Sequence, residues 1–417
     1  MRVLALSNLY PPHALGGYEW SAHDVLRRLH ERGHDVEVLT TETRLPEVAD
    51  GEVAPFPVHR ILGWYWDDHE LTSPHPVRRL ALERRNLRAL RAALDRHRPD
   101  VVSVWNMGAL SHGLLRAVAD RGVPMVYAVC DEWPVYGPHL DAWGRIFRHR
   151  PALARVAEAA LRVPCRPTDL GPTGAWCFVS SHTRDACIAG SPYTFPRATV
   201  VHSGIEADDF PLTEPDHERP FAWRLLYVGR LDVRKGVLTA VDALAQLPDE
   251  ATLTLVGRGD AAEAVAARAR QHGVADRVTV RSAERAALAT AYRDADVLLF
   301  TSEWAEPFGL TPIEAMACGT PVVGTGTGGS AGFLLDGRTC LRYPPGDAVA
   351  LAAAVRRLAG DPTLRARLRQ GGRAVAAELT TERLADTFEA WHAAAADGFA
   401  HGIPPERPLL AADHAAR

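Results

Sequence analysis

Short apolar runs alternate with amphipathic segments along the first half of the chain. The runs predict β-strands at Arg2–Leu6, Asp35–Thr40, Val101–Trp105, Pro124–Val129 and Ala175–Val179. Between them the apolar period changes to that of a helix, for example at Glu19–Arg32 and Val77–His97. Strands that alternate with helices in this way are typical of βαβ units and a parallel sheet.

The same pattern starts again in the second half. It predicts strands at Arg224–Val228, Thr252–Val256, Arg277–Val280, Val297–Phe300 and Pro321–Val323. It predicts helices at Val237–Leu247, Asp260–His272, Arg285–Arg293, Thr311–Cys318, Ala348–Ala359 and Pro362–Glu378. The restart indicates two successive doubly wound α/β domains rather than one continuous sheet.

A chain of 417 residues has the length of two domains. We expect a first domain at 1–204, a second at 205–380, and a tail at 381–417 whose helix Thr381–Ala396 packs back on the first domain. Pro211, Pro215 and Pro220 mark the boundary. Ligands of doubly wound sheets bind at the carboxyl ends of the strands, so we expect two Rossmann-like domains facing a central cleft.

Composition excludes several classes of protein. The chain is 47% apolar and 24% charged with a net charge of −4, which does not favour a nucleic-acid partner. No apolar run is long enough to cross a membrane, and the first strand is too short for a signal peptide. The six cysteines show no CxxC spacing and the 18 histidines no metal-ligand cluster. We therefore expect a cytoplasmic protein with reduced thiols and without a metal site.

Lys235 is the single lysine among 47 basic residues. It lies in the segment Gly229-Arg230-Leu231-Asp232-Val233-Arg234-Lys235-Gly236, directly after the apolar run 225–228. A buried strand that ends in a glycine turn with two cations predicts a site for an anion. An ammonium group is a compact charge on a flexible stem, which an arginine fork does not reproduce at a tight site.

The segment 306–323 carries the densest signal. It reads Glu306-Pro307-Phe308-Gly309-Leu310-Thr311-Pro312-Ile313-Glu314-Ala315-Met316-Ala317-Cys318-Gly319-Thr320-Pro321-Val322-Val323. Pro312 suits a first helical turn, and Gly309 allows the backbone to approach a ligand closely. The N–H groups of Leu310 and Thr311 then face an anion such as a phosphate or diphosphate. Glu314 would reach ribose hydroxyls, and Glu306 would face the opposite end of the same ligand.

These motifs resemble the retaining glycosyltransferase family 4, which has the GT-B fold. Glu306 and Glu314 match its E-x7-E motif, and Gly229-Arg230 with Lys235-Gly236 is similar to its diphosphate-binding segment. The other matching motifs are Gly16-Gly17 in the N-terminal glycine loop, the turn Arg32-Gly33-His34-Asp35-Val36, Gly328-Gly329, Asp336-Gly337 and Pro345-Gly346-Asp347. The resemblance extends from about residue 2 to the mid-380s.

The resemblance implies sugar transfer from a nucleotide-diphosphate donor, UDP- or GDP-linked, with retention and without a metal or other cofactor. Arg230 and Lys235 would neutralise the diphosphate of the leaving group. Glu306, helped by the backbone from Phe308 to Leu310, would contact the donor sugar, and Glu314 would hold the ribose. Gly17 would approach the diphosphate or the acceptor, and Gly257 would line the nucleotide pocket.

The chain departs from the family pattern at three places, one of which is the family's histidine contact to the donor sugar. The family's His-Asp pair is Cys130-Asp131 here, so Asp131 is a candidate for orienting the acceptor and His139 for replacing the histidine. The family's Asn-Gly at the linker is Ser203-Gly204, and the Glu that often follows the Gly-Gly pair is absent. These changes bear on the sugar preference.

Acceptor residues are expected in the first domain, with Gly16, Trp64 and Trp66 as candidates. The loop Trp64-Tyr65-Trp66-Asp67-Asp68-His69 suits a sugar ring or an apolar aglycone, but its aromatics are equally explained as cover for the core. The eight arginines of 77–98 favour a solvated helix face over a peripheral membrane contact.

Three other functions stay open from the sequence. A nucleotide-sugar epimerase would use the same fold, but no carboxylate and histidine cluster suits proton abstraction. A non-catalytic nucleotide-sugar-binding protein would have little reason to keep Lys235, Glu306 and Glu314 together. A nicotinamide enzyme would rest on Val256-Gly257-Arg258-Gly259 alone. We expect a transferase acting on a small-molecule, natural-product or lipid-linked saccharide acceptor.

Overall fold

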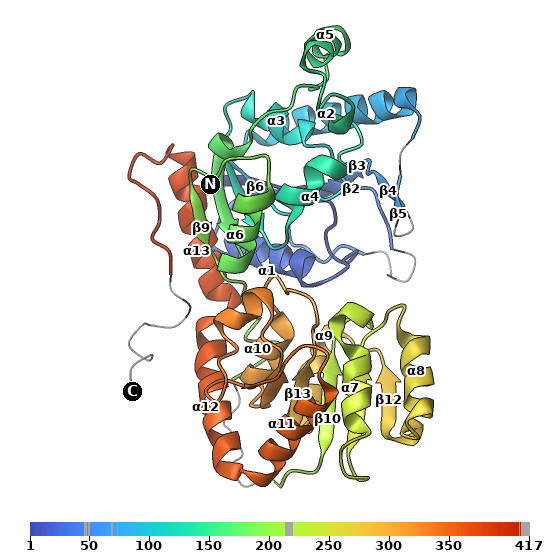
Figure 1. The fold of residues 1–417 in the computed structure, drawn as a ribbon. Helices are drawn as coiled ribbons and strands as arrows, with labels where there is room; N and C mark the ends of the chain where they lie inside the picture. The colour runs from blue at the N-terminus through green and yellow to red at the C-terminus, as the bar shows by residue number, and fades with distance from the viewer. Residues whose placement is uncertain are drawn as a thin grey trace. The chain divides into compact units, whose positions relative to one another are not determined.

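The computed structural model describes residues 1–45, 48, 51–67, 70–72, 74–212, 220–407 and 409. Its contacts divide the chain into two compact units (Figure 1). The N-terminal unit is Met1–His202 together with Leu384–Arg407, and the C-terminal unit is Ser203–Arg383. Of the three prolines expected at the boundary, Pro215 lies outside the described residues.

The N-terminal unit is built on a parallel seven-stranded sheet in the order β3-β2-β1-β6-β7-β8-β9. Its strands are β1 (Arg2–Leu6), β2 (Asp35–Thr41), β3 (Val58–Leu62), β6 (Val101–Val104), β7 (Met125–Val129), β8 (Gly174–Phe178) and β9 (Ala198–Val200). Its helices include α1 (Gly17–Glu31), α2 (Pro76–His97), α3 (Gly113–Ala119), α4 (Trp133–Leu140), α5 (Pro151–Leu161) and α6 (Ser181–Gly190). A short antiparallel pair, β4 (Trp66–Asp67) and β5 (Glu70–Leu71), lies apart from the sheet.

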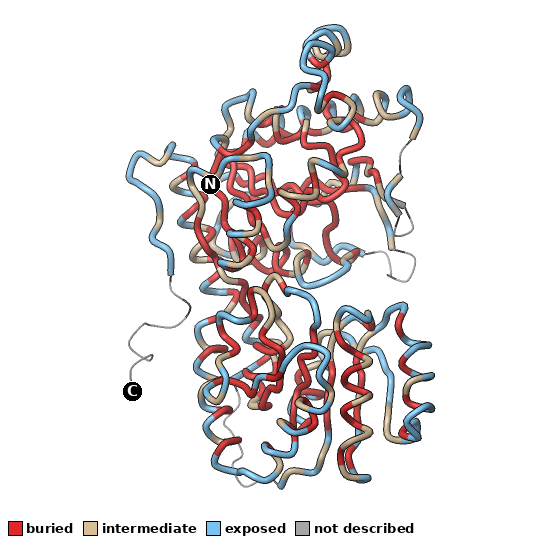
Figure 2. Tube along the Cα trace, in the orientation of Figure 1, coloured by how far each residue is buried: buried red, intermediate tan, exposed pale blue. Residues whose placement is uncertain are grey.

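Both faces of this sheet are buried, as a parallel sheet requires. Along β1, Val3 and Ala5 belong to one apolar cluster with α1, while Leu4 and Leu6 belong to another with α2 and α3. Figure 2 shows the buried strands enclosed by helices whose outer faces are exposed. Because successive side chains of a strand point to opposite faces, one short apolar run contributes to the cores on both sides of the sheet.

The C-terminal unit repeats this plan with six parallel strands in the order β12-β11-β10-β13-β14-β15. They are β10 (Arg224–Val228), β11 (Thr252–Val256), β12 (Val278–Arg281), β13 (Val297–Phe300), β14 (Val322–Gly324) and β15 (Leu341–Arg342). Its helices include α7 (Val237–Leu244), α8 (Ala262–Gln271), α9 (Arg285–Asp294), α10 (Leu310–Ala317), α11 (Ala348–Gly360) and α12 (Pro362–Glu378). The prediction of two doubly wound domains is confirmed. The sequence did not predict β3, β9 and β15, which are short edge strands with polar positions.

The last helix, α13 (Thr381–Ala396), packs on the N-terminal unit. It contributes Leu384, Phe388, Trp391 and Ala395 to the cluster that holds Val3 and α1. This confirms the expected return of the C-terminal helix.

Polar contacts fix α13 beside the turn after α1. Arg32 forms ion pairs with Asp386 at 2.8 Å and with Glu389 at 2.6 Å, and His34 contacts Glu389 at 2.7 Å. The Arg-Gly-His turn noted in the sequence thus anchors the chain's last helix. Within the described part of the chain, no helix has the length and apolar character needed to cross a membrane.

Candidate functional site

The strand order of the C-terminal unit reverses between β10 and β13, and we call the space outside the carboxyl ends of these two strands the crevice. These two strands are neighbours, and the chain continues from β10 outward to β11 and from β13 outward to β14. In doubly wound sheets, ligands bind at the carboxyl ends of the strands at such a switch point. The loops that follow these strands are residues 229–236 and 301–309, which contain Lys235 and Glu306.

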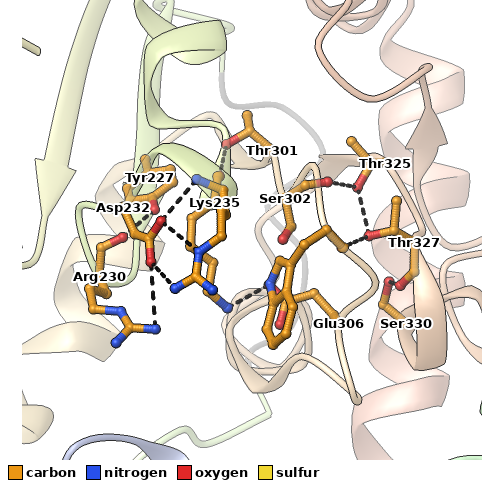
Figure 3. A network of polar contacts seen from close by, with 12 residues as sticks. Tyr227, Arg230, Asp232, Lys235, Thr301, Ser302, Glu306, Thr325, Thr327 and Ser330 are labelled. Atoms are coloured by element: carbon orange, nitrogen blue, oxygen red, sulfur yellow. Dashed lines mark hydrogen bonds and ion pairs between the residues drawn. The ribbon is translucent and has the colours of Figure 1, made fainter. Parts of the chain in front are cut away.

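Lys235 and Glu306 meet across these loops, although 71 positions separate them. The Lys235 Nζ donates to Glu306 Oε1 at 2.6 Å (Figure 3). The exposed fraction is 25% for the Lys235 side chain and 5% for that of Glu306. The ammonium therefore reaches solvent while it neutralises an almost buried carboxylate.

The backbone around Lys235 is held by Thr301. The Thr301 hydroxyl donates to the Lys235 carbonyl at 2.8 Å. Gly236 has φ +66°, and a Cβ there would lie 1.9 Å from the Thr301 carbonyl oxygen. A glycine is required because the loop both turns in the left-handed region and touches its neighbour.

Glu306 is held by the Gly328-Gly329 pair. The Gly329 N–H donates to the Glu306 carbonyl at 2.6 Å, and a Cβ on Gly328, whose φ is +59°, would lie 2.3 Å from that oxygen. Hydroxyls of the same segment fix the loop before it, since Thr325 donates to the Ser302 carbonyl and Thr327 to the Trp304 carbonyl (Figure 3). The Gly328-Gly329 pair, which belongs to the family motifs noted in the sequence, thus positions the Glu306 backbone.

Arg230 lies on the same loop as Lys235 and contacts Asp232. Its guanidinium is 3.7 Å from the Asp232 carboxylate, and its side chain is 58% exposed. Arg234 binds Asp232 more closely, at 2.7 Å, and its hydrogen bond is the main reason that the pKa of Asp232 falls to about 2. Asp232 is therefore ionised and holds two cations at the edge of the crevice.

The start of α10 faces the same loops. Gly309 is its N-cap, with φ +103°, and a Cβ there would lie 2.9 Å from the Phe300 ring. No side chain caps this helix, so Leu310 and Thr311 present their N–H groups without competition from a cap. Phe308 is buried, with its ring 5.2 Å from that of Phe333. Packed aromatic rings thus support the start of α10, where the helix dipole favours an anion.

Glu314 lies on the second turn of α10. Its Oε2 accepts from the Tyr292 hydroxyl of α9 at 2.6 Å. Burial raises the pKa of Glu314, partly opposed by this hydrogen bond and by the nearby Arg285. Its other oxygen can still accept from ligand hydroxyls.

Gly229 and Gly257 serve the contact between two loops. Both have positive φ, +151° and +156°, and a Cβ on Gly257 would lie 1.9 Å from the Gly229 carbonyl oxygen. Close packing of the loops after β10 and β11 thus explains Gly257 without a ligand, and the positive φ alone explains Gly229. Their predicted donor contacts stay predictions.

In the N-terminal unit, Asp131 follows β7. Its carboxylate accepts from the Trp133 N–H and from the Tyr136 hydroxyl, both at 2.9 Å. Burial raises the pKa of Asp131 to about 6. Its charge changes in the range in which enzymes commonly operate.

Glu19 was missed by the sequence reasoning. It is 5% exposed, and its Oε2 accepts from the Gly16 N–H at 3.0 Å, so it fixes the entry of the glycine loop into α1. Burial, with help from the Asp131 charge, raises the pKa of Glu19 to about 7. The signal was available, because Glu three positions after an N-cap is typical of a capping box. Gly17 opens α1 on the exposed side of this loop.

The other acceptor candidates lie elsewhere in this unit. His139 is exposed near the end of α4, at the opposite end of that helix from Asp131, and its Nδ1 is 2.6 Å from Arg148. The rings of Trp64 and Trp66 are 4.6 Å apart, and the Trp64 Nε1 donates to the Gly108 carbonyl. Asp68 and His69 of the aromatic loop lie outside the described residues.

Trp304 is a further residue of this region that the sequence did not predict. Its ring centroid lies 5.3 Å from the Lys235 Nζ and 5.8 Å from the Arg234 guanidinium carbon. The side chain is 38% exposed, so an aromatic face stands beside the cations of the crevice. Its place two residues before Glu306 was the available signal.

Family models match both units. "Glycosyl transferase 4-like domain" matches residues 16–167, and "Glycosyl transferases group 1" matches residues 215–375. Glycogen synthase of Mycobacterium tuberculosis is 31% identical over 403 residues, which cover 92% of this chain and 91% of that protein. The chain belongs to the family 4 glycosyltransferases.

Further relatives of this glycosyltransferase agree. D-inositol 3-phosphate glycosyltransferase of Xylanimonas cellulosilytica is 37% identical over 195 residues, covering 43% of this chain and 46% of that protein. Among solved structures, sucrose-phosphate synthase of Thermosynechococcus elongatus has a TM-score of 0.70 at 23% identity, covering 96% of this chain and 99% of that one. HepE of Anabaena, in complex with UDP, has a TM-score of 0.68 at 20% identity, covering 93% and 98%. These two likenesses show the GT-B fold.

In the described ranges, no group of three or more His, Cys, Asp and Glu side chains is arranged to hold a metal ion. The cations of the crevice are Arg230, Arg234 and Lys235, which belong to the chain itself.

Proposed function

We propose that this glycosyltransferase moves a sugar from a nucleotide-diphosphate donor to a hydroxyl group with retention of anomeric configuration and without a metal. The observation that carries the proposal is the Lys235–Glu306 pair at the switch point of the C-terminal sheet. It sets a cation and a carboxylate side by side in the crevice where a doubly wound domain binds its ligand.

The donor diphosphate would bind between Lys235, Arg230 and the first N–H groups of α10. Electrostatic stabilisation of the leaving group is commonly the largest contribution to catalysis of this kind. Glu314 would accept from the ribose hydroxyls through the oxygen opposite Tyr292. The solved HepE structures contain UDP, and one contains UDP-glucose, which supports a UDP-linked donor.

The sugar would lie against Glu306, which would accept from its hydroxyls. In the proposed reaction the bond between the anomeric carbon and the diphosphate oxygen breaks. A bond from that carbon to the acceptor oxygen forms on the same face. The acceptor proton passes to the diphosphate oxygen, so no protein nucleophile is needed. Lys235 and Arg230 would stabilise the charge that grows on the diphosphate.

Asp131 would orient the acceptor hydroxyl, with Tyr136 holding its other oxygen. The family includes an inositol phosphate transferase and glycogen synthase among the relatives of this chain, so small-molecule and saccharide acceptors are both open. The wall around the acceptor would be formed by Gly16, Gly17, Trp64 and Trp66.

A panel of UDP- and GDP-sugars tests this function. We expect one donor to raise the unfolding temperature, because a ligand at 100 times its Kd stabilises the native state by about 2.7 kcal/mol. With that donor and an acceptor, NMR should show the donor's anomeric configuration in the product, and EDTA should leave the rate unchanged. An inverted product or a rate restored only by a divalent ion would refute the mechanism.

We propose the cytoplasm as the location, since all six cysteines are free thiols, as in a reducing compartment. We also propose a peripheral membrane contact through the exposed arginines of α2, which include Arg84, Arg88 and Arg91. Sedimentation with anionic vesicles tests it. No co-sedimentation at low salt would exclude the contact.

A further inference from the structure

A pocket of about 280 Å³ lies inside the N-terminal unit, apart from the crevice described above. Its walls include the start of α3, the end of α4, and the segments that lead into β8 and β9. Those segments meet the amino ends of their strands, whereas Asp131 follows the carboxyl end of β7. No residue assigned above to the donor or the acceptor lines it.

Two aromatic and four proline rings make up much of the wall. They are Trp143, Tyr193, Pro138, Pro164, Pro167 and Pro192. Binding sites for small molecules are typically apolar and carry a few polar groups that fix orientation. Rings of this kind suit a ligand with a flat ring of its own.

Arg148 gives the pocket an uncommitted cation. Among the residues that the structure describes, Arg148 forms no ion pair with a carboxylate. Its guanidinium donates instead to the His139 Nδ1 at 2.6 Å. A guanidinium has only donors, so the histidine nitrogen accepts and carries no proton there.

The other charged groups of the wall already have partners, the two aspartates through hydrogen bonds and the two arginines through ion pairs. Asp141 accepts from the N–H groups of His112, Trp143 and Gly144. Asp169 accepts from Gly171 and Thr194. Arg116 binds Asp120 at 2.7 Å, and Arg166 binds Glu158 at 2.6 Å. An incoming anion would therefore find Arg148 as its partner.

His112 adds a buried polar atom without a partner. The residue is 8% exposed, and its Nδ1 lies 2.5 Å from the Tyr193 hydroxyl. Its Nε2 has no hydrogen-bond partner among the described residues. Burial lowers the pKa of His112, which keeps the ring neutral at pH 7. Leaving a buried polar atom unsatisfied carries a free-energy cost.

The pocket is joined to Asp131 by one short helix. The first turn of α4 holds Asp131 through Trp133 and Tyr136, and its last turn supplies Pro138 to the pocket wall. The His112 ring packs edge-on against Trp133 at 5.5 Å and lies so close to Gly137 that a Cβ there would be 2.8 Å away. The same helix therefore contacts both the pocket wall and the Asp131 carboxylate.

We propose that this pocket binds a small organic anion with a flat ring, separately from the donor, and that its occupancy is coupled through α4 to Asp131. The binding itself does not depend on the proposed transfer reaction. The coupling does, because it acts on the residue assigned to the acceptor.

Calorimetry on the full chain tests the binding, with 2-naphthoate as the probe. We expect saturable binding that persists with excess UDP present and in Lys235→Ala. 2-Naphthamide, which has the ring without the charge, and inorganic phosphate, which has the charge without the ring, should each bind at least tenfold more weakly. Equal binding of phosphate, loss of naphthoate binding with UDP, or no saturable binding would overturn the site.

Arg148→Gln is the decisive variant, and Arg150→Gln is its matched control two residues away, exposed and outside the wall. Naphthoate affinity should fall at least tenfold in the first and stay unchanged in the second, with both variants unfolding at the wild-type temperature. Equal affinity in the two variants would refute the role of Arg148.

The coupling is read from the acceptor KM with and without naphthoate. We expect at least a twofold change in the wild type and in Arg150→Gln, and none in Arg148→Gln. An unchanged KM with the site saturated would remove the coupling and leave the binding site. No transfer with any donor would refute the proposed function without touching the binding result.

Discussion

The ion pair between Lys235 and Glu306 has two parts of unequal exposure. The carboxylate is 5% exposed and the ammonium 25% exposed, so removal of the lysine leaves an almost buried negative charge. Breaking such a pair from one side costs more than replacing both partners, because the remaining charge is uncompensated. Any test of Lys235 must therefore separate catalysis from stability.

Lys235→Ala should lower the transfer rate by on the order of 10²–10³, as loss of one oxyanion-stabilising donor does. Steady-state kinetics with the donor found in the panel measures it. Lys235→Ala combined with Glu306→Gln is the stability control, because it removes both charges. If the double variant regained near wild-type turnover, the lysine would only be neutralising Glu306.

Glu314 offers a ligand one oxygen while Tyr292 holds the other. Glu314→Gln keeps an acceptor and the size of the side chain, whereas Glu314→Ala removes both. Calorimetry with the cognate nucleoside diphosphate should show affinity weakened by roughly tenfold in the alanine variant, or about 1.4 kcal/mol. Unchanged affinity would separate Glu314 from the ribose.

Glu19 links stability to pH. Its pKa rises from 4.5 to about 7 in the folded chain, so the native state keeps a proton that the unfolded state loses first. The free energy of unfolding therefore falls as the pH rises from 4.5 to about 7, by roughly 3 kcal/mol. Glu19→Gln should remove this part of the pH dependence in denaturant titrations.

Glu31→Gln, at the exposed end of the same helix, is the control for Glu19. It should keep the wild-type pH dependence. A Glu19→Gln variant with the same slope as the wild type would show that its carboxyl titrates normally.

At the scale of elements, helix starts and glycine turns set the geometry of the crevice. The short helix η3 (Val233–Lys235) ends at Gly236, and α7 begins immediately after it. The turn has to be left-handed and must also touch the Thr301 carbonyl. Two requirements at one position explain why the Lys235 loop tolerates only glycine there.

Gly236→Ala should destabilise the C-terminal unit by several kcal/mol and lower the transfer rate, because the backbone next to Lys235 must move. Gly273→Ala is a matched control, since its φ is +68° but a Cβ there would meet nothing within 4 Å. It should cost about 1–2 kcal/mol, the left-handed strain alone. Similar losses in the two variants, measured by denaturant titration, would contradict the steric argument.

At the scale of the whole molecule, the chain returns to its first unit through α13. Trp391 of α13 is 1% exposed and lies in the cluster that holds β1 and α1. The last helix is therefore part of the N-terminal core, although nearly 400 residues separate Trp391 from Met1.

Trp391→Ala should destabilise the N-terminal unit by about 3–5 kcal/mol. Hydrogen exchange should become faster in β1 and α13 and stay unchanged in β10 and β13. Ala390→Gly, on the exposed side of the same helix, should cost about 1 kcal/mol from helix propensity alone. Equal protection of both units after Trp391→Ala would show that α13 is not part of the core.

The sequence alone determined the architecture. Buried parallel strands appear as short apolar runs and amphipathic helices as a helical spacing of apolar residues, and both patterns can be seen in the local sequence. It predicted two doubly wound domains, a returning helix with the bounds Thr381–Ala396, and the segments that hold Lys235 and Glu306. Each of those segments is a short run that contains glycines, basic residues or carboxylates. Such a run can be recognised in the sequence before the fold is known.

Only the tertiary structure decided which residues meet. The contact of Lys235 with Glu306, the Gly328-Gly329 support of Glu306 and the Tyr292 bond to Glu314 join residues that are far apart in sequence. The same holds for the Arg148 pocket, whose wall residues lie between positions 111 and 193. Such contacts depend on strand order and on burial by distant segments, which no local pattern encodes.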